Sequence, residues 1–104
     1  MKNESLSEAV YRLVSQIPEG KVSTYGTLAR ELNVPKASRA IGSILRANPH
    51  PIVVPCHRVV MSDGQLGGYG GSKGVGRKAA LLRGEGVEVT KGRVDLERYL
   101  FKSD

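Results

Sequence analysis

The sequence is poor in cysteine, in histidine and in long apolar runs. Its 104 residues include one cysteine and two histidines. No internal disulfide can form, and a dedicated zinc site is not expected, because such sites need several Cys or His ligands. No uninterrupted apolar stretch exceeds four residues, far short of the ~20 that span a bilayer. No basic start leads into an apolar core, so we expect no signal peptide. These absences favour a cytoplasmic protein without metal, cofactor or membrane contact.

Acidic residues are the minority, with 16 Lys and Arg against 10 Asp and Glu and a formal net charge of +6. The excess is concentrated in residues 21–84, where ten basic and two acidic residues give +8 and leave −2 for the flanks. A basic middle is typical of proteins that bind the phosphate backbone of a nucleic acid. A basic surface without a partner has the same composition, so charge alone leaves both interpretations open.

Hydrophobic periodicity predicts a helix at the beginning of the chain. Ser5 and Glu8 have the spacing of a capping box, in which each residue satisfies a free backbone donor of the other. Apolar residues then recur on one side of a helix over about residues 6–16, and Pro18 follows as a helix breaker. We expect this helix to serve as a scaffold.

Two shorter helices follow and have the pattern of a helix-turn-helix. The first is expected to begin after Ser23 or Thr24 and to end at Asn33, a residue type that tolerates the left-handed conformation. The second is expected over residues 37–46. A pair of short helices with basic residues on the second is typical of this DNA-binding motif, although many small helical proteins contain such pairs.

The second half of the chain predicts short extended segments and one more helix. Apolar residues around a tight turn predict a hairpin over 59–66, and a second hairpin is expected over 87–96. A glycine-rich loop is expected over 67–76, followed by a helix over 78–83. We find no internal repeat or linker, so residues 1–104 are expected to form a single domain.

Pro55-Cys56-His57-Arg58 is the segment that points to chemistry. A lone cysteine after an apolar stretch is usually a small buried hydrophobe. A neighbouring imidazole that takes up the thiol proton, however, produces the thiolate, which is the reactive species. Because successive residues of a strand point to opposite faces, Cys56 and His57 need a local bend or a bridging water to communicate.

Six motifs contain or flank this segment in a specific order: IPEGKVSTYG (17–26), PKASRAIG (35–42), NP (48–49), IVVPCHRVV (52–60), GGYGG (67–71) and LLRGEG (81–86). Together they resemble the C-terminal, active-site domain of the O6-alkylguanine-DNA alkyltransferases, also called methylated-DNA–protein-cysteine methyltransferases. The resemblance covers about residues 5–89. It implies a mainly α, winged-helix-like helix-turn-helix DNA-binding domain with small β-hairpins.

The resemblance implies a set of residues for the reaction. Cys56 matches the acceptor cysteine, which attacks the alkyl group on guanine O6 and keeps it. His57 matches the histidine that deprotonates the thiol through a bound water, and Glu85 matches the glutamate that orients this histidine. Tyr25 matches the tyrosine that helps to protonate the leaving guanine. Asn48 matches the asparagine that stabilises the helix-turn-helix against the active-site strand.

The resemblance also implies residues that bind DNA and the damaged base. Arg39 matches the arginine finger that takes the place of the flipped-out nucleotide. Tyr69 matches a residue that lines the base pocket. The other DNA-binding positions lie on or beside the helix of Arg39, where small residues allow close approach to the minor groove: Lys36, Ala37, Ser38, Gly42 and Arg46. The other pocket positions are Pro55, Val59, Gly70 and Gly71, and Gly70 stands where many relatives carry a side chain.

Several of these matches also have a plainer interpretation. Glu85 would serve equally as a solvated residue near a helix end, and Arg39 as an ordinary phosphate contact. Tyr25 would serve as an aromatic that packs between helices, and Tyr69 as a plug in the core. For the two tyrosines the plain role and the pocket role are compatible.

The resemblance implies direct-reversal DNA repair by a stoichiometric acceptor. The implied partner is double-stranded DNA that contains O6-alkylguanine, and the protein is expected to be a monomer, associated with the nucleoid if its source is prokaryotic. No cofactor is implied. The chain lacks the N-terminal domain that most relatives carry, so we expect a minimal version of the family.

Two other functions are compatible with parts of the sequence. Alkyltransferase-like proteins of similar length bind damaged guanine without repairing it and flag it for other machinery. They replace the cysteine, usually by tryptophan, so Cys56 favours the enzyme. A transcription factor that reads the major groove is not expected, because the helix over 37–46 has too many small residues for base readout.

Overall fold

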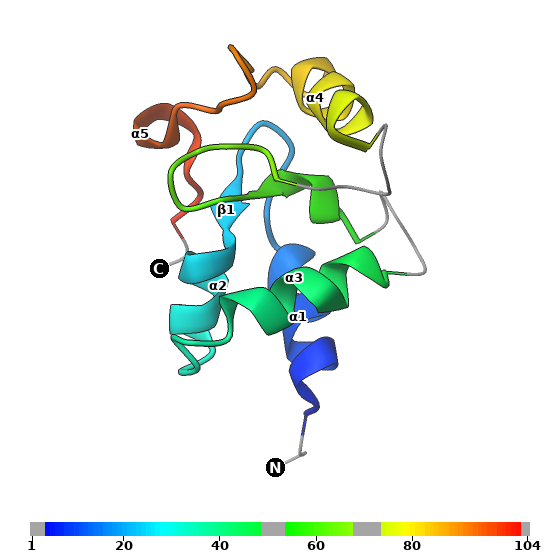
Figure 1. Ribbon diagram of the computed structural model, residues 1–104, viewed down its shortest axis with the longest axis vertical. Coiled ribbons are helices and arrows are strands. Elements are labelled where there is room, and N and C mark those ends of the chain that lie inside the picture. Colours follow the sequence, from blue (N-terminus) through cyan, green and yellow to red (C-terminus); the bar gives the residue numbers. More distant parts are fainter. Residues whose placement is uncertain (1–3, 49–53, 68–73, 103–104) are drawn as a thin grey trace.

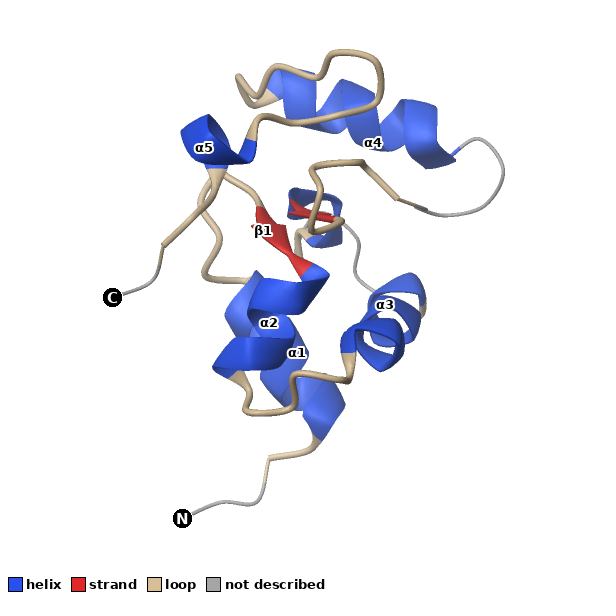
Figure 2. Cartoon of the chain, turned by 60° about the vertical axis from the view of Figure 1, so that its left-hand side comes forward, coloured by secondary structure: helices blue, strands red, loops and turns tan. Residues whose placement is uncertain are grey.

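The computed structural model describes residues 4–48, 54–67 and 74–102. Helices dominate these residues, which confirms the predicted mainly α class (Figure 1). The elements in chain order are α1 (Leu6–Val14), β1 (Ser23–Thr24), α2 (Tyr25–Glu31), α3 (Ser38–Arg46), the 3-10 turn η1 (Cys56–Arg58), β2 (Val59–Val60), α4 (Gly74–Gly84) and α5 (Leu96–Tyr99). Helices α1, α2 and α3 form one end of the molecule and α4 and α5 the other, with β1 between them (Figure 2).

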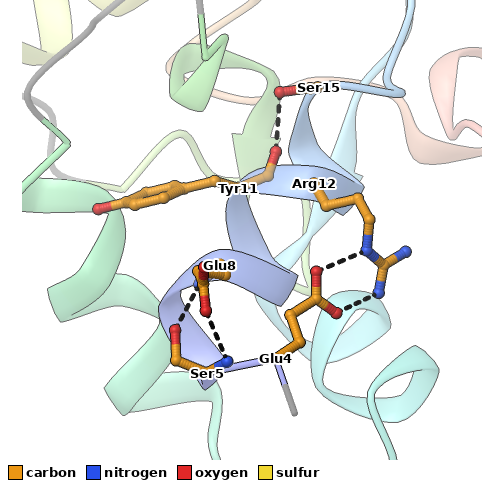
Figure 3. A network of polar contacts seen from close by, with 6 residues as sticks. All are labelled: Glu4, Ser5, Glu8, Tyr11, Arg12 and Ser15. Carbon is orange, nitrogen blue, oxygen red and sulfur yellow. Dashed lines mark hydrogen bonds and ion pairs between the residues drawn. The ribbon is translucent and has the colours of Figure 1, made fainter. Parts of the chain in front are cut away.

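Helix α1 begins at the predicted capping box. The backbone N–H of Glu8 donates to Ser5 Oγ at 3.1 Å, and the backbone N–H of Ser5 donates to Glu8 Oε1 at 2.9 Å (Figure 3). Arg12 and Glu4 form an exposed ion pair beside this cap. The helix ends at Val14, two residues earlier than the periodicity predicted. The local sequence therefore determines where this helix begins better than where it ends.

Helices α2 and α3 form the predicted helix-turn-helix. Thr24 caps α2 by accepting from the backbone N–H of Thr27 at 3.0 Å. Asn33 has a φ of 60°, the left-handed conformation expected after this helix. The hydroxyl of Tyr11 donates to the carbonyl of Ile44 at 2.8 Å and ties α1 to α3. The apolar faces of the three helices meet in a first core of Val10, Val14, Ile17, Leu28, Ala29, Ile41, Leu45, Cys56 and Val59.

The two strands, β1 and β2, pair with each other in parallel. The predicted antiparallel strand pair over 59–66 is therefore wrong. Strand β1 lies beside β2 with Ser23 opposite Val59. The predicted tight turn does form, since the N–H of Met61 donates to the carbonyl of Gln65 at 2.8 Å. Gln65 then bridges to Arg93. The arm after the turn therefore pairs with a distant residue and does not run back along β2.

The predicted hairpin over 87–96 is reduced to one bridge between Thr90 and Arg93. Asp95 ends the extended stretch, because its carboxylate accepts from the backbone N–H of Glu97 at 3.0 Å and begins α5. The glycine-rich loop is also shorter than predicted, since α4 begins at Gly74 and includes Gly76.

The C-terminal segment completes a second hydrophobic core. The N–H of Val22 donates to the carbonyl of Tyr99 at 2.9 Å, and the N–H of Phe101 donates to the carbonyl of Val22 at 2.7 Å. These bonds place α5 beside β1. The second core consists of Val22, Val60, Leu66, Ala79, Leu82, Val87, Val89, Val94 and Tyr99. The strands thus separate two cores, and the turn η1 lies where they meet.

Candidate active site

The sequence predicts Cys56 at the end of a strand. In the structure it lies instead at the beginning of a 3-10 turn. Its side chain is buried, with 7% of the residue exposed. The N–H of Cys56 donates to the carbonyl of Val54 at 2.7 Å, and the N–H of Arg58 donates to the carbonyl of Pro55 at 2.9 Å. The turn removes the strict alternation of a strand. It therefore removes the constraint that would place the Cys56 and His57 side chains on opposite faces of a strand.

His57 is fully buried and contacts Glu85, the residue that the resemblance paired with it. Its Nε2 lies 2.9 Å from Glu85 Oε2. A ring nitrogen that faces a carboxylate carries the proton, so the neutral imidazole keeps its lone pair on Nδ1. The contact selects the tautomer in which Nδ1 can accept a proton.

Arg58 holds Glu85 in place, a relationship that the sequence analysis missed. Its Nε donates to Oε1 at 2.9 Å and its Nη2 to Oε2 at 2.7 Å, a bidentate and therefore strong pair. Its Nη1 donates to the carbonyl of Ile17 at 2.8 Å. Partial burial raises the pKa of Glu85, but the hydrogen bonds from Arg58 and His57 outweigh it and hold this pKa below its ordinary value. Glu85 is thus an oriented carboxylate and not a freely solvated one.

Lys78 is the second residue that the sequence analysis missed, because it was counted with the basic surface. Its side chain is fully buried. Its Nζ donates to the carbonyl of Val59 at 2.7 Å and to the carbonyl of Leu66. The same atom lies 5.9 Å from the centre of the Tyr25 ring. Burial lowers the pKa of Lys78 to about 8, although the charge of the nearby Cys56 thiolate opposes this shift.

Tyr25 lies half-buried at the first position of α2. Burial and the charge of the Cys56 thiolate raise the pKa of Tyr25, while Arg46 lowers it less strongly. The phenol therefore keeps its proton at neutral pH, as a proton donor must. Gly42 of α3 lies against the ring, since a methyl group there would be 3.9 Å from Tyr25 Cε1.

Asn48 follows α3 and contacts the segment that leads to Cys56. Its side-chain amide donates to the carbonyl of Val54 at 2.9 Å. This contact joins the helix-turn-helix to the active-site segment, as the resemblance implied. The structure therefore brings His57, Arg58 and Glu85 together beside the turn that carries Cys56, and Asn48 ties that segment to α3.

The predicted DNA-binding residues lie on α3 and on the turn before it. Arg39 occupies the first turn of α3 and is exposed. The exposed positions of the set are Lys36, Arg39 and Arg46, and the half-buried ones are Ala37, Ser38 and Gly42. The guanidinium of Arg46 donates to Ser43 Oγ at 3.1 Å. The three cations are exposed and can contact an anionic partner. The small residues between them allow such a partner to approach the helix closely.

The base pocket is only partly placed. Pro55 and Val59 are buried on either side of the Cys56 turn, whereas Tyr69, Gly70 and Gly71 lie outside the described residues.

Within the described ranges, no group of three His, Cys, Asp or Glu side chains could hold a metal ion. No helix in those ranges is long and apolar enough to cross a bilayer.

Comparison with known proteins gives the family. Residues 5–87 match the model of the DNA-binding domain of 6-O-methylguanine DNA methyltransferase. The chain belongs to this family. The resemblance drawn from the sequence motifs is therefore confirmed.

Two relatives illustrate how much of the family this chain represents. A bifunctional methyltransferase/endonuclease of Picrophilus torridus is 47% identical over 99% of this chain and 34% of its own length. The methylated-DNA–protein-cysteine methyltransferase of Mycobacterium tuberculosis is 38% identical over 97% of this chain and 57% of its own length. The chain thus spans between a third and three fifths of these relatives.

Solved structures share the fold. The crystal structure of S. pombe Atl1 in complex with damaged DNA containing O6-carboxymethylguanine is 34% identical with a TM-score of 0.86, covering 99% of this chain and 100% of that one. The structure of Mycobacterium tuberculosis OGT in complex with DNA is 40% identical with a TM-score of 0.73, covering 81% of this chain and 51% of that one. The predicted fold class is confirmed.

Proposed function

We propose that this protein binds duplex DNA containing O6-alkylguanine and transfers the alkyl group to Cys56. The observation that carries this proposal is the contact series in which Arg58 clamps Glu85 and Glu85 holds His57 next to the buried Cys56. A thiol next to an imidazole–carboxylate pair is a competent nucleophile. Membership of the 6-O-methylguanine DNA methyltransferase family supports this substrate class.

In the proposed reaction, His57 Nδ1 takes the thiol proton, through a bound water as in the resembling family. The Sγ of Cys56 attacks the alkyl carbon, and the bond between that carbon and guanine O6 breaks. The electron pair of the broken bond stays with guanine, which takes a proton from Tyr25; the proton on His57 restores the phenol. The products are a thioether on Cys56 and unmodified guanine. Because a thioether is a poor leaving group, each protein accepts one alkyl group.

The DNA-bound state requires the damaged nucleotide to leave the base stack, because O6 is not accessible to a sulfur atom inside a duplex. We assign Arg39 to the gap, since it is exposed at the start of α3. A side chain that fills the gap offsets part of the unstacking cost of a few kcal/mol. The DNA complexes of S. pombe Atl1 and Mycobacterium tuberculosis OGT support DNA as the partner.

The second candidate function is lesion binding without transfer. The observation that favours it is the match to S. pombe Atl1 over 100% of that chain. The presence of Cys56, buried next to His57, favours transfer instead. Both candidates share the binding step and differ only in the fate of the sulfur.

Intact-mass spectrometry of the protein after incubation with a duplex containing O6-methylguanine tests the proposal. We expect the mass of one methyl group to be added, peptide mapping to place it on Cys56, and the DNA to regain guanine. Cys56→Ala should abolish the transfer and keep the affinity for the lesion. An unmodified protein that binds the lesion tightly would establish the second candidate and overturn the first.

A further inference from the structure

Lys78 is a buried cation that the proposed reaction does not use. Its residue is 0% exposed, and its ammonium has three N–H donors, of which the carbonyls of Val59 and Leu66 take two. Among the described residues, no carboxylate pairs with it: the ion pairs there join Arg12 to Glu4, His57 and Arg58 to Glu85, and Arg98 to Glu88. A buried charge is costly unless an opposite charge compensates it.

Lys78 lies close to residues that are assigned to the reaction. It lies 5.9 Å from the Tyr25 ring, and it bonds to Val59, which directly follows the Cys56 turn. Its other acceptor, Leu66, directly precedes Gly67, where a methyl group would be 3.7 Å from the Tyr25 hydroxyl. The buried ammonium thus lies next to Tyr25 and Val59, two residues assigned to the reaction and the base, and its charge acts on whatever binds beside them.

We propose that the site prefers guanines whose O6 substituent carries a negative charge, such as a carboxymethyl group, over neutral substituents of the same shape, and that Lys78 sets this preference. The inference rests on the proposed binding of O6-alkylguanine. A carboxylate bound near Tyr25 would compensate the buried charge through space, because charges attract more strongly in low-dielectric surroundings than in water. The O6-carboxymethylguanine complex of S. pombe Atl1 indicates that the fold has room for such a substituent.

The preference belongs to binding and not to the transfer step. The Cys56 thiolate is itself an anion near Lys78, and its charge acts on the pKa of this lysine. A carboxylate substituent and a thiolate therefore compete for one cation when the sulfur is activated. We expect the anionic lesion to bind more tightly than its neutral counterpart and to transfer its alkyl group no faster.

The test measures dissociation constants for duplex DNA with the Cys56→Ala variant, which has no thiol and therefore transfers no alkyl group. Three duplexes are compared, with O6-carboxymethylguanine, with its neutral isostere O6-carbamoylmethylguanine, and with guanine. We expect the carboxymethyl duplex to bind about tenfold more tightly than the carbamoylmethyl duplex. Lys78→Met should remove this difference. Lys36→Gln, which removes an exposed cation, should weaken both lesion duplexes by the same factor.

Raising the pH tests the same point without a substitution that could disturb the fold. Burial lowers the pKa of Lys78 to about 8, and Cys56→Ala removes the thiolate charge that opposes this shift, so the ammonium is lost by about pH 9 and the preference should disappear. Tyr25, the other titratable group that faces Lys78 in this variant, has a raised pKa and keeps its proton at neutral pH. Equal affinity for the two lesions at about pH 7 would overturn the inference.

A third lesion separates this inference from the proposed function. Suppose that an O6-methylguanine duplex binds more tightly than undamaged DNA, but that the carboxymethyl and carbamoylmethyl duplexes bind equally. In that case only the charge preference is wrong. If no lesion binds more tightly than undamaged DNA, the proposed function and the preference fail together. A preference that persists in Lys78→Met would assign it to another cation and also refute the role of Lys78.

Discussion

The side-chain amide of Asn48 donates to the carbonyl of Val54 at 2.9 Å, so a residue just after α3 holds the backbone just before Cys56. Helix α3 carries the residues assigned to DNA, and Cys56 is the assigned acceptor. This hydrogen bond therefore couples the position of α3 to the position of the backbone that carries the sulfur.

We expect Asn48→Ala to lower the free energy of unfolding by about 1–3 kcal/mol, because the half-buried carbonyl of Val54 loses its donor. Urea titration followed by circular dichroism measures this change. Ser43→Ala on the same helix is the matched control, since Ser43 is exposed and its contact with Arg46 lies on the surface. Equal losses in the two variants would show that the bond to Val54 adds no stability.

The clamp between Arg58 and Glu85 predicts a pH-dependent contribution to stability. The pKa of Glu85 is held below its ordinary value of 4.5, so the stabilisation from its carboxylate is present above that pH and is lost as the pH falls below it. Arg58→Met should therefore cost about 2–3 kcal/mol near neutral pH. The gap between the unfolding curves of the variant and the parent protein should narrow in acid.

Arg12→Met is the control for this measurement, because it breaks the exposed pair between Arg12 and Glu4. It should shift the unfolding midpoint far less than Arg58→Met at neutral pH. A gap between Arg58→Met and the parent that stays constant down to about pH 3 would mean that Glu85 is not the partner that matters.

The affinity for undamaged duplex DNA should depend strongly on salt and weakly on sequence. The logarithm of the affinity should fall linearly with the logarithm of the salt concentration, with a slope of about 0.9 per phosphate contacted. Lys36→Gln should reduce the slope by about one contact. Lys78→Met should leave the slope unchanged, because Lys78 is buried. A titration insensitive to salt would contradict a phosphate-binding surface.

The exposed Arg39 predicts a difference between substrates. Arg39→Ala should slow transfer from a duplex far more than transfer from a single strand or from free O6-benzylguanine, since only a stacked base costs a few kcal/mol to extrude. Single-turnover rates on the three substrates measure this effect. Equal losses on all three would show that Arg39 only supports the fold or contacts a phosphate.

The parts of the fold that could be predicted from the sequence are those decided by near neighbours. The capping box of Ser5 and Glu8 and the left-handed Asn33 each depend on a few adjacent residues, and all of them form as expected. The parallel pairing of β1 with β2 depends on how the chain returns from α3, which no local pattern records. The residues around Asp95 alternate between apolar and polar, which is typical of a strand. Asp95 nevertheless caps the short helix α5, which this alternation does not reveal.

The same division applies to the site. Cys56, His57 and Glu85 could be named from motifs, and the structure brings His57 and Glu85 into contact. Arg58 and Lys78 were counted only as positive charges, because the burial of a charged side chain depends on segments far away in the sequence. The carbonyl of Ile17 and the carbonyl of Leu66 are such partners.

The backbone bonds that join Val22 to Tyr99 and Phe101 bear on the order in which the molecule is made. The buried members of the first core end at Val59, so the helix-turn-helix can assemble while the rest of the chain is still on the ribosome. The second core needs Tyr99, and closing so long a loop is slow. The helix-turn-helix, to which the proposal assigns DNA binding, therefore matures first, and α4 with Lys78 is fixed in place only after the segment around Tyr99 has been made.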